Sequence, residues 1–256
     1  MSTSGRIQDA IDDPSKYQEI KAAIARKPAL KAIYKEFYGY YRDCLKRCPE
    51  NGPVVEIGAG AGFASEVVPE LILTDLIKYP TIDVVIDATQ LPFPAQSVRC
   101  LVMLNTFHHI ADCGRFLEEA ARCLAPGGRL LIIDQHRGFV SRPILRLFHH
   151  EHYDDRAVEW CFDSTGPLSG ANGALAWIVF IRDREKFERS RPELRVVRYQ
   201  PIMPLRYWLS GGLRRWNLLP GFFECVGRAL DRGLLLLSRD FGSFVVIELL
   251  RARSRP

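Results

Sequence analysis

Between residues 54 and 133, short aliphatic runs that suit β-strands alternate with segments of helical periodicity. Strands that alternate with helices pair in parallel through right-handed crossovers, and helices then cover both faces of the sheet. We therefore expect an α/β fold, a three-layer αβα sandwich around a mostly parallel sheet. The link between the second and third runs is too short for a helix. The strand-like runs are residues 54–57, 71–74, 83–86, 100–104 and 129–133.

The flanking segments extend this core at both ends. A breaker-rich segment, residues 49–53, separates an N-terminal helical cap, residues 1–50, from a main domain, residues 51–256. Two looser segments, at about 135–172 and 204–240, read as insertions in the main domain. Two later runs bring the expected sheet to seven strands. These strands are expected at 194–199 and 243–250, and helices at 6–48, 115–124, 175–189 and 221–238.

The segment 54–62, VVEIGAGAG, leads from a strand through glycines into a helix. Glycines allow a tight turn and a close approach of the backbone to a ligand. Dinucleotide-binding enzymes use a similar turn, so the glycines alone leave the ligand open. The spacing here is G-x-G-x-G, and Glu56 lies two residues before Gly58. An acid at this position repels a pyrophosphate and favours a ligand that carries positive charge.

Two further acids follow the next two strands. Asp75 ends the second strand, where a carboxylate can accept both ribose hydroxyls of a nucleoside. Asp87 ends the third strand, where a carboxylate can accept from an adenine amino group. Since the carboxyl ends of parallel strands share one edge of the sheet, Glu56, Asp75 and Asp87 are expected to face one ligand.

These residues belong to five motifs that occur in order over about 80 residues. Through them, the segment 54–134 resembles the class I S-adenosylmethionine-dependent methyltransferases, especially their small-molecule branch. The resemblance implies a Rossmann-like sheet, methyl transfer, and S-adenosylmethionine as the cofactor; it does not cover the rest of the chain. The motifs are residues 56–60 (EIGAG), 73–75 (LTD), 86–88 with 91–93 (IDA and LPF), 105–109 (NTFHH) and 124–130 (LAPGGRL).

The resemblance also implies roles for the residues of these motifs. The first motif would hold the methionyl part of the cofactor, Asp75 the ribose, and Asp87 with Ala88 the edge of the adenine. Leu76 would lie against the adenine, and Asn105 would approach the methionyl end. The predicted cofactor-binding residues are Glu56, Gly58, Ala59, Gly60, Gly62, Asp75, Leu76, Asp87, Ala88 and Asn105.

Methyl transfer is an in-line displacement at an activated sulfonium carbon, so alignment of the reactants can supply much of the catalysis. A general base is needed only when the acceptor is a hydroxyl or a protonated amine. His108 and His109 follow the fourth strand at the ligand edge, and either could be that base. A packed or hydrogen-bonded histidine explains them equally well.

Two segments beyond the fifth strand carry chemically suggestive residues. Residues 149–155, HHEHYDD, contain three histidines but lack the spacing of H-E-x-x-H, so we expect no metal site and read them as a loop or helix end near the acceptor pocket. Residues 166–173, GPLSGANG, form a turn-rich loop that could be a lid over the acceptor or a plain connector.

Positive charge is concentrated in the C-terminal quarter of the chain. The chain has 35 basic and 30 acidic residues, a mild net charge of +5, which gives no reason to expect a nucleic-acid partner. From residue 189 onwards there are 13 Arg and five acids, an excess of eight positive charges. Aromatic and basic residues interleave over 205–237, which suggests a membrane-surface patch; packing on the sheet or on a second subunit is the alternative.

The seven cysteines are odd in number and follow no secretory signal, which indicates reduced thiols in the cytoplasm. No apolar run is long enough for a transmembrane helix. We expect an enzyme that methylates a small-molecule or lipid-linked acceptor, such as a glycan or glycolipid, at oxygen, with peripheral membrane contact through its C-terminal region. The alternatives are a methyltransferase of a free metabolite and a non-catalytic module that binds the cofactor.

Overall fold

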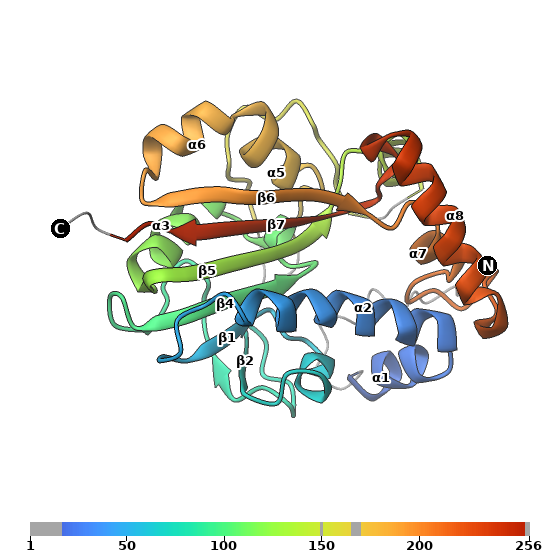
Figure 1. Cartoon of the computed structure of the whole chain (residues 1–256), viewed down its shortest axis with the longest axis horizontal. Coiled ribbons are helices and arrows are strands. Elements are labelled where there is room, and N and C mark those ends of the chain that lie inside the picture. Colours follow the sequence, from blue (N-terminus) through green and yellow to red (C-terminus); the bar gives the residue numbers. More distant parts are fainter. Residues whose placement is uncertain (1–16, 149–150, 165–169, 254–256) are drawn as a thin grey trace.

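The computed structural model of the chain describes residues 17–148, 151–164 and 170–253. Seven strands form one sheet in the order β3-β2-β1-β4-β5-β7-β6 (Figure 1). The first five pair in parallel, whereas β7 runs antiparallel to both β5 and β6. The expected seven-stranded, mostly parallel sheet is confirmed. The strands are β1 (Val54–Ile57), β2 (Leu71–Asp75), β3 (Val84–Val85), β4 (Val98–Leu104), β5 (Leu124–Gln135), β6 (Leu194–Ile202) and β7 (Phe244–Arg251).

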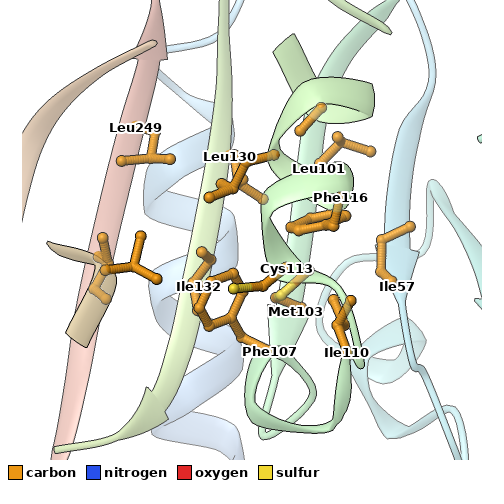
Figure 2. Close-up of a cluster of buried hydrophobic side chains, with 14 of the residues drawn as sticks. Ile57, Leu101, Met103, Phe107, Ile110, Cys113, Phe116, Leu130, Ile132 and Leu249 are labelled. Atoms are coloured by element: carbon orange, nitrogen blue, oxygen red, sulfur yellow. The ribbon is translucent and has the colours of Figure 1, made fainter. Parts of the chain in front are cut away.

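Side chains alternate across each strand, so the sheet has a separate hydrophobic core on each face. One face is covered by α2 (Pro28–Leu45), whose Phe37 and Tyr41 are fully buried. The other face is covered by α3 (Cys113–Cys123), α5 (Leu175–Trp177) and α6 (Arg184–Ser190). Figure 2 shows part of this second core, where side chains of β4, β5 and α3 meet. The three-layer αβα sandwich is confirmed.

Two elements differ from their expected form. The helix expected at 175–189 is broken by a π-helical turn, Ile178–Arg182, between α5 and α6. The glycine loop leads into a single 3-10 turn, Phe63–Glu66, instead of a helix. A 3-10 turn of this length aligns few peptide dipoles, so the loop lacks the helix N-terminus on which pyrophosphate sites depend.

Helices from both ends of the chain gather at the carboxyl edge of the sheet. They are α1 (Tyr17–Ala25), α7 (Arg206–Leu209) and α8 (Glu224–Leu237), with the N-terminal half of α2 (Figure 1). The buried Lys27 ties these parts together, because its Nζ donates to the carbonyls of Ser210 at 3.1 Å, Gly212 at 2.8 Å and Trp216 at 2.9 Å. In the part of the chain that the structure describes, no helix is long and apolar enough to cross a membrane.

Candidate active site

A cavity of about 860 Å³ opens at the carboxyl ends of β1, β2 and β4. Its size is in the range of pockets that hold small ligands and cofactors. One part is formed by the glycine loop and the strand ends, and includes all the predicted cofactor-binding residues except Gly62. The other part is formed by the helices at the carboxyl edge and is mostly apolar. Its lining includes Tyr17, Ile20, Ile24, Tyr34, Tyr38, Tyr207, Trp208 and Leu213.

Two glycines of the loop, Gly58 and Gly60, lie in different surroundings. Gly58 has a φ of 70°, and a Cβ there would lie 2.4 Å from Cγ2 of Thr106. Only glycine fits this close approach between the loops that follow β1 and β4. Gly60 has a φ of 51°, but a Cβ there would meet no atom within 4 Å. The loop is therefore fixed by packing at Gly58, whereas Gly60 is open on its Cβ side.

Glu56 lies inside β1 and is 3% exposed. The hydroxyl of Tyr41 donates to its Oε1 at 3.1 Å, and its Oε2 accepts no hydrogen bond from the residues that the structure describes. Burial raises the pKa of Glu56 to about 8, the Tyr41 hydrogen bond opposes this rise, and the Asp75 carboxylate adds to it. A buried carboxyl of this kind gains most from a ligand that brings its own positive charge.

Asp75 and Asp87 lie at neighbouring strand ends in different surroundings. Asp75 ends β2 and accepts from the backbone N–H of Gly60 at 2.9 Å and of Ile77 at 3.0 Å, so it also fixes the glycine loop. Burial raises its pKa. Asp87 is exposed, two residues beyond β3, and its Oδ1 accepts from the N–H and hydroxyl of Thr89. Both carboxylates line the cavity.

The strand-end loop after β4 brings a second partnerless acceptor to the same part of the cavity. Asn105 has a φ of 52°, in the left-handed region that asparagine tolerates, and its N–H donates to the carbonyl of Ile133 at 2.8 Å. Its Oδ1 is buried and, within the described part of the chain, accepts no hydrogen bond. Glu56 Oε2 and Asn105 Oδ1 thus offer acceptors to a cationic donor group. Leu76, 48% exposed, lines the same part of the cavity and offers an apolar surface.

His108 is 2% exposed and is held at both ring nitrogens. Its Nδ1 lies 2.6 Å from Oδ1 of Asp134, and its Nε2 lies 3.2 Å from Oε2 of Glu151. Burial lowers the pKa of His108, but the two carboxylates outweigh burial and raise it to about 10. In this arrangement His108 has no free nitrogen to accept a proton, so the geometry gives no support to the prediction of a general base at this residue.

His109 lies beside His108, with the two ring centroids 4.2 Å apart. Its Nδ1 is 3.3 Å from the carbonyl of Gly170, and its Nε2 is 3.6 Å from Oε1 of Glu151. Both histidines line the cavity. The structure thus brings the two predicted histidines together around one carboxylate, Glu151.

Two residues of this site, Asp134 and Glu151, are not among the residues predicted from the sequence. Asp134 is in β5, next to the strand's last residue, and the rule that placed Asp75 and Asp87 at strand ends would also have found it. Glu151 comes from the segment HHEHYDD, and no local pattern connects it to the histidines of the fourth-strand motif. His149, His150 and residues 165–169 lie outside the described residues. The described end of the turn-rich loop packs here too, since the N–H of Asn172 donates to the carbonyl of His108 at 2.9 Å.

Residues 55–132 match the methyltransferase domain family. Over 48 residues the chain is 42% identical to 27-O-demethylrifamycin SV methyltransferase of Amycolatopsis mediterranei (strain S699), a match that spans 19% of this chain and 18% of that protein. The chain therefore spans less than a fifth of the length of this curated relative.

Solved structures of low sequence identity share the fold. Geranyl diphosphate C-methyltransferase from Streptomyces coelicolor A3(2), solved with Mg²⁺, geranyl diphosphate and S-adenosyl-L-homocysteine, is 15% identical with a TM-score of 0.50, over 96% of this chain and 87% of that one. A chain of the Haloferax volcanii complex that contains the Trm112 methyltransferase activator is 18% identical with a TM-score of 0.50, over 94% and 99%.

Proposed function

We propose that this chain, a class I S-adenosylmethionine-dependent methyltransferase by its domain at residues 55–132, transfers a methyl group to a small-molecule or lipid-linked acceptor, at oxygen. S-adenosylmethionine is the cofactor of this family. The observation that carries the proposal is the division of one cavity into a polar part at the strand ends and an apolar part under the helices. The first part suits the cofactor and the second suits an acceptor with an apolar body.

The polar part fits the cofactor in charge and in hydrogen bonding. The partnerless oxygens of Glu56 and Asn105 would accept from the ammonium of the methionyl end. The remaining lone pairs of Asp75 would accept from the ribose hydroxyls, and Leu76 would pack against the adenine. Bound in this way, the cofactor supplies a methyl group on a sulfonium, and the chain supplies its orientation.

The acceptor part supports the choice of an apolar, oxygen-bearing substrate. Aromatic rings and aliphatic side chains from α1, α2 and α7 would hold the body of the acceptor. Between this part and the cofactor stand His109 and Glu151, the polar groups that would meet the reacting oxygen. We propose that these two residues contribute to catalysis mainly by holding that oxygen in line with the sulfonium carbon.

A methyl-transfer screen against lipid, sugar and small-molecule fractions tests the proposal, with Asp75→Ala as the cofactor-deficient control. Transfer to an apolar hydroxyl compound is expected. A chain that binds S-adenosylmethionine in calorimetry but methylates no fraction would favour the non-catalytic module. Transfer confined to polar metabolites would favour the alternative of a free metabolite.

We predict that Ile20→Trp separates the two parts of the cavity. Ile20 lies on α1, is half-buried and lines the apolar part. The larger ring would fill space intended for the acceptor, so the KM for the acceptor should rise about tenfold while the Kd for S-adenosylmethionine stays unchanged. Steady-state kinetics and calorimetry measure the two effects. Equal weakening of both ligands would show that α1 does not border an acceptor site.

The outer surface of α8 supports the membrane contact that we propose for this region. The helix turns Gly227 and Asp231 inward, whereas Val226, Leu230 and Leu237 are 50%, 54% and 78% exposed. Residues three, four and seven positions apart share one helix face, so these three form an apolar stripe on the outside. Phe222 and Phe223 extend the stripe beyond the start of the helix and are 76% and 50% exposed.

Basic and apolar residues flank this stripe. Arg214 and Arg215 are exposed in the loop before α8, and Arg214 Nη2 donates to the carbonyl of Phe148 at the end of α4 (Ser141–Leu147). Phe148 is 68% exposed. Apolar side chains beside arginines suit the interface of an anionic bilayer, whereas a dimer interface tends to exclude unpaired charge. The seven free cysteines favour a reducing compartment, so we place this contact on the cytoplasmic side.

We predict that Leu230→Glu together with Phe222→Glu abolishes co-sedimentation with vesicles that contain anionic lipid. Arg214→Glu with Arg215→Glu should weaken co-sedimentation strongly, and more so at low salt. Ser190→Glu, at an exposed position of another helix, α6, is a control for the added charge. Equal soluble fractions for all variants would remove the membrane contact. Loss of a concentration-dependent dimer in the first variant would instead identify a subunit interface.

A further inference from the structure

His108, His109 and Glu151 place three metal-ligating side chains at one point of the cavity wall. Each offers one ligand atom, a ring nitrogen or a carboxylate oxygen, and these three atoms all lie within 4.8 Å of one another. His108 Nε2 is 3.2 Å from Glu151 Oε2, and His109 Nε2 is 3.6 Å from Glu151 Oε1. Ligand atoms about 2.0–2.2 Å from an ion at the centre of a tetrahedron lie about 3.3–3.6 Å apart. The two nitrogen–oxygen distances are close to this spacing, and the whole set is compact enough to draw in around one ion.

The groups behind these ligands orient them toward that point. Asp134 Oδ1 accepts from Nδ1 of His108 at 2.6 Å, and the carbonyl of Gly170 is placed to accept from Nδ1 of His109 at 3.3 Å. With Nδ1 as the donor, each ring directs the lone pair of Nε2 toward Glu151. Carboxylates and backbone carbonyls hold metal-bound histidines in this manner. Gln135 Nε2 donates to Glu151 Oε2 at 3.1 Å and orients the carboxylate.

The charge around the three ligands also suits a divalent cation. The carboxylates of Asp134 and Glu151 lie on either side of His108, and Asp134 is fully buried. These carboxylates bring two negative charges to this point, and a divalent ion bound there would balance both. Buried charge is tolerated best when it is balanced and coordinated in this manner.

We propose that His108, His109 and Glu151 bind one divalent transition-metal ion of the zinc class at the wall of the cavity. Two imidazoles and a carboxylate form the donor set that zinc and iron(II) sites use when they keep a position open for substrate. All three residues line the cavity, so the open position would face it and would take an oxygen of the methyl acceptor. This last step rests on the proposed function, whereas the metal site itself does not.

The test uses the full chain after dialysis against a chelator. Titration with Co²⁺, followed by its visible absorbance, and calorimetry with Zn²⁺ should each give one site per chain. His109→Ala and Glu151→Gln should weaken the binding at least about 100-fold, and Asp134→Asn about tenfold through His108. His152→Ala, an exposed histidine of the same segment as Glu151, should leave it unchanged.

Binding of S-adenosylmethionine, measured in the same samples, separates the two proposals. A chain that binds the cofactor but no metal ion would overturn the metal site and leave the methyltransferase intact. Metal binding that survives in both His109→Ala and Glu151→Gln would also overturn the site, because it would then lie elsewhere. Equal melting temperatures of the variants without metal would show that lost affinity is not lost folding.

Discussion

Glu56→Gln is expected to weaken binding of S-adenosylmethionine by about 100-fold, which corresponds to nearly 3 kcal/mol. Glutamine keeps the shape of Glu56 and can still accept from the Tyr41 hydroxyl. It cannot supply the negative charge that, in our proposal, pairs with the ammonium group of the cofactor. Isothermal calorimetry measures the loss, and Glu66→Gln, an exposed acid just after the glycine loop, is the matched control. Unchanged affinity in Glu56→Gln would exclude contact between Glu56 and the ammonium.

The same substitution has a consequence for pH dependence. The pKa of Glu56 in the free protein is raised by burial to about 8, above its ordinary value of 4.5. Between these two values the folded state holds a proton that the unfolded state has lost, so stability falls as pH rises through this window. Glu56→Gln should remove this fall, and its melting temperature relative to the wild type should be higher at pH 8.5 than at pH 5. Below pH 8, cofactor binding to the wild type should release a proton.

Arg206→Ala is expected to lower the free energy of unfolding by about 3–5 kcal/mol. Its guanidinium is almost fully buried, with Nε 2.7 Å from Asp231, Nη1 2.7 Å from Glu224 and Nη2 2.9 Å from Glu36. Removing it leaves three partly or fully buried carboxylates without their shared partner. Denaturant titration measures the loss. Arg232→Ala, an exposed arginine on α8, the helix that carries Glu224 and Asp231, should cost less than about 0.5 kcal/mol.

Arg206 also links this stability to the acceptor part of the cavity. The three acids come from α2 and α8, and Arg206 begins α7, whose next residues Tyr207 and Trp208 line the cavity. In a variant that remains folded, such as Arg206→Lys, the KM for the acceptor should rise more than the Kd for S-adenosylmethionine. Equal changes in both would show that the ion pairs stabilise the whole fold without positioning the acceptor site.

The cluster at Arg206 changes the reading of the C-terminal charge. Arg206 and Arg228 were counted among basic residues of a surface patch, but Arg206 is enclosed by acids and Arg228 pairs with Glu224 at 2.9 Å. The exposed arginines of this segment are Arg214, Arg215 and Arg232. A count of charges along the chain cannot distinguish arginines that are paired with acids from arginines that are exposed. The partners of Arg206, for example, include Glu36, 170 residues away.

Helix α8 shows that periodicity along the sequence can locate a helix without identifying which of its faces is buried. Its periodicity gives a helix over 221–238, and the structure has the 3-10 turn Gly221–Phe223 followed by α8. Periodicity also predicts that the apolar stripe faces the core. Here the polar face is the buried one, because Arg206 provides partners for Glu224 and Asp231, and the apolar stripe is left outside.

Sequence patterns predicted the parallel part of the sheet, the glycine loop and the acids Glu56, Asp75 and Asp87, which line the cavity. These features follow from local rules, since strand periodicity, glycine φ angles and strand ends are all read within a few residues. Only the tertiary structure placed Glu151 beside His108, surrounded Arg206 with acids and turned the apolar stripe of α8 outward. Each of these depends on groups far apart in the chain, and burial of charge is settled by the partners that folding brings to it.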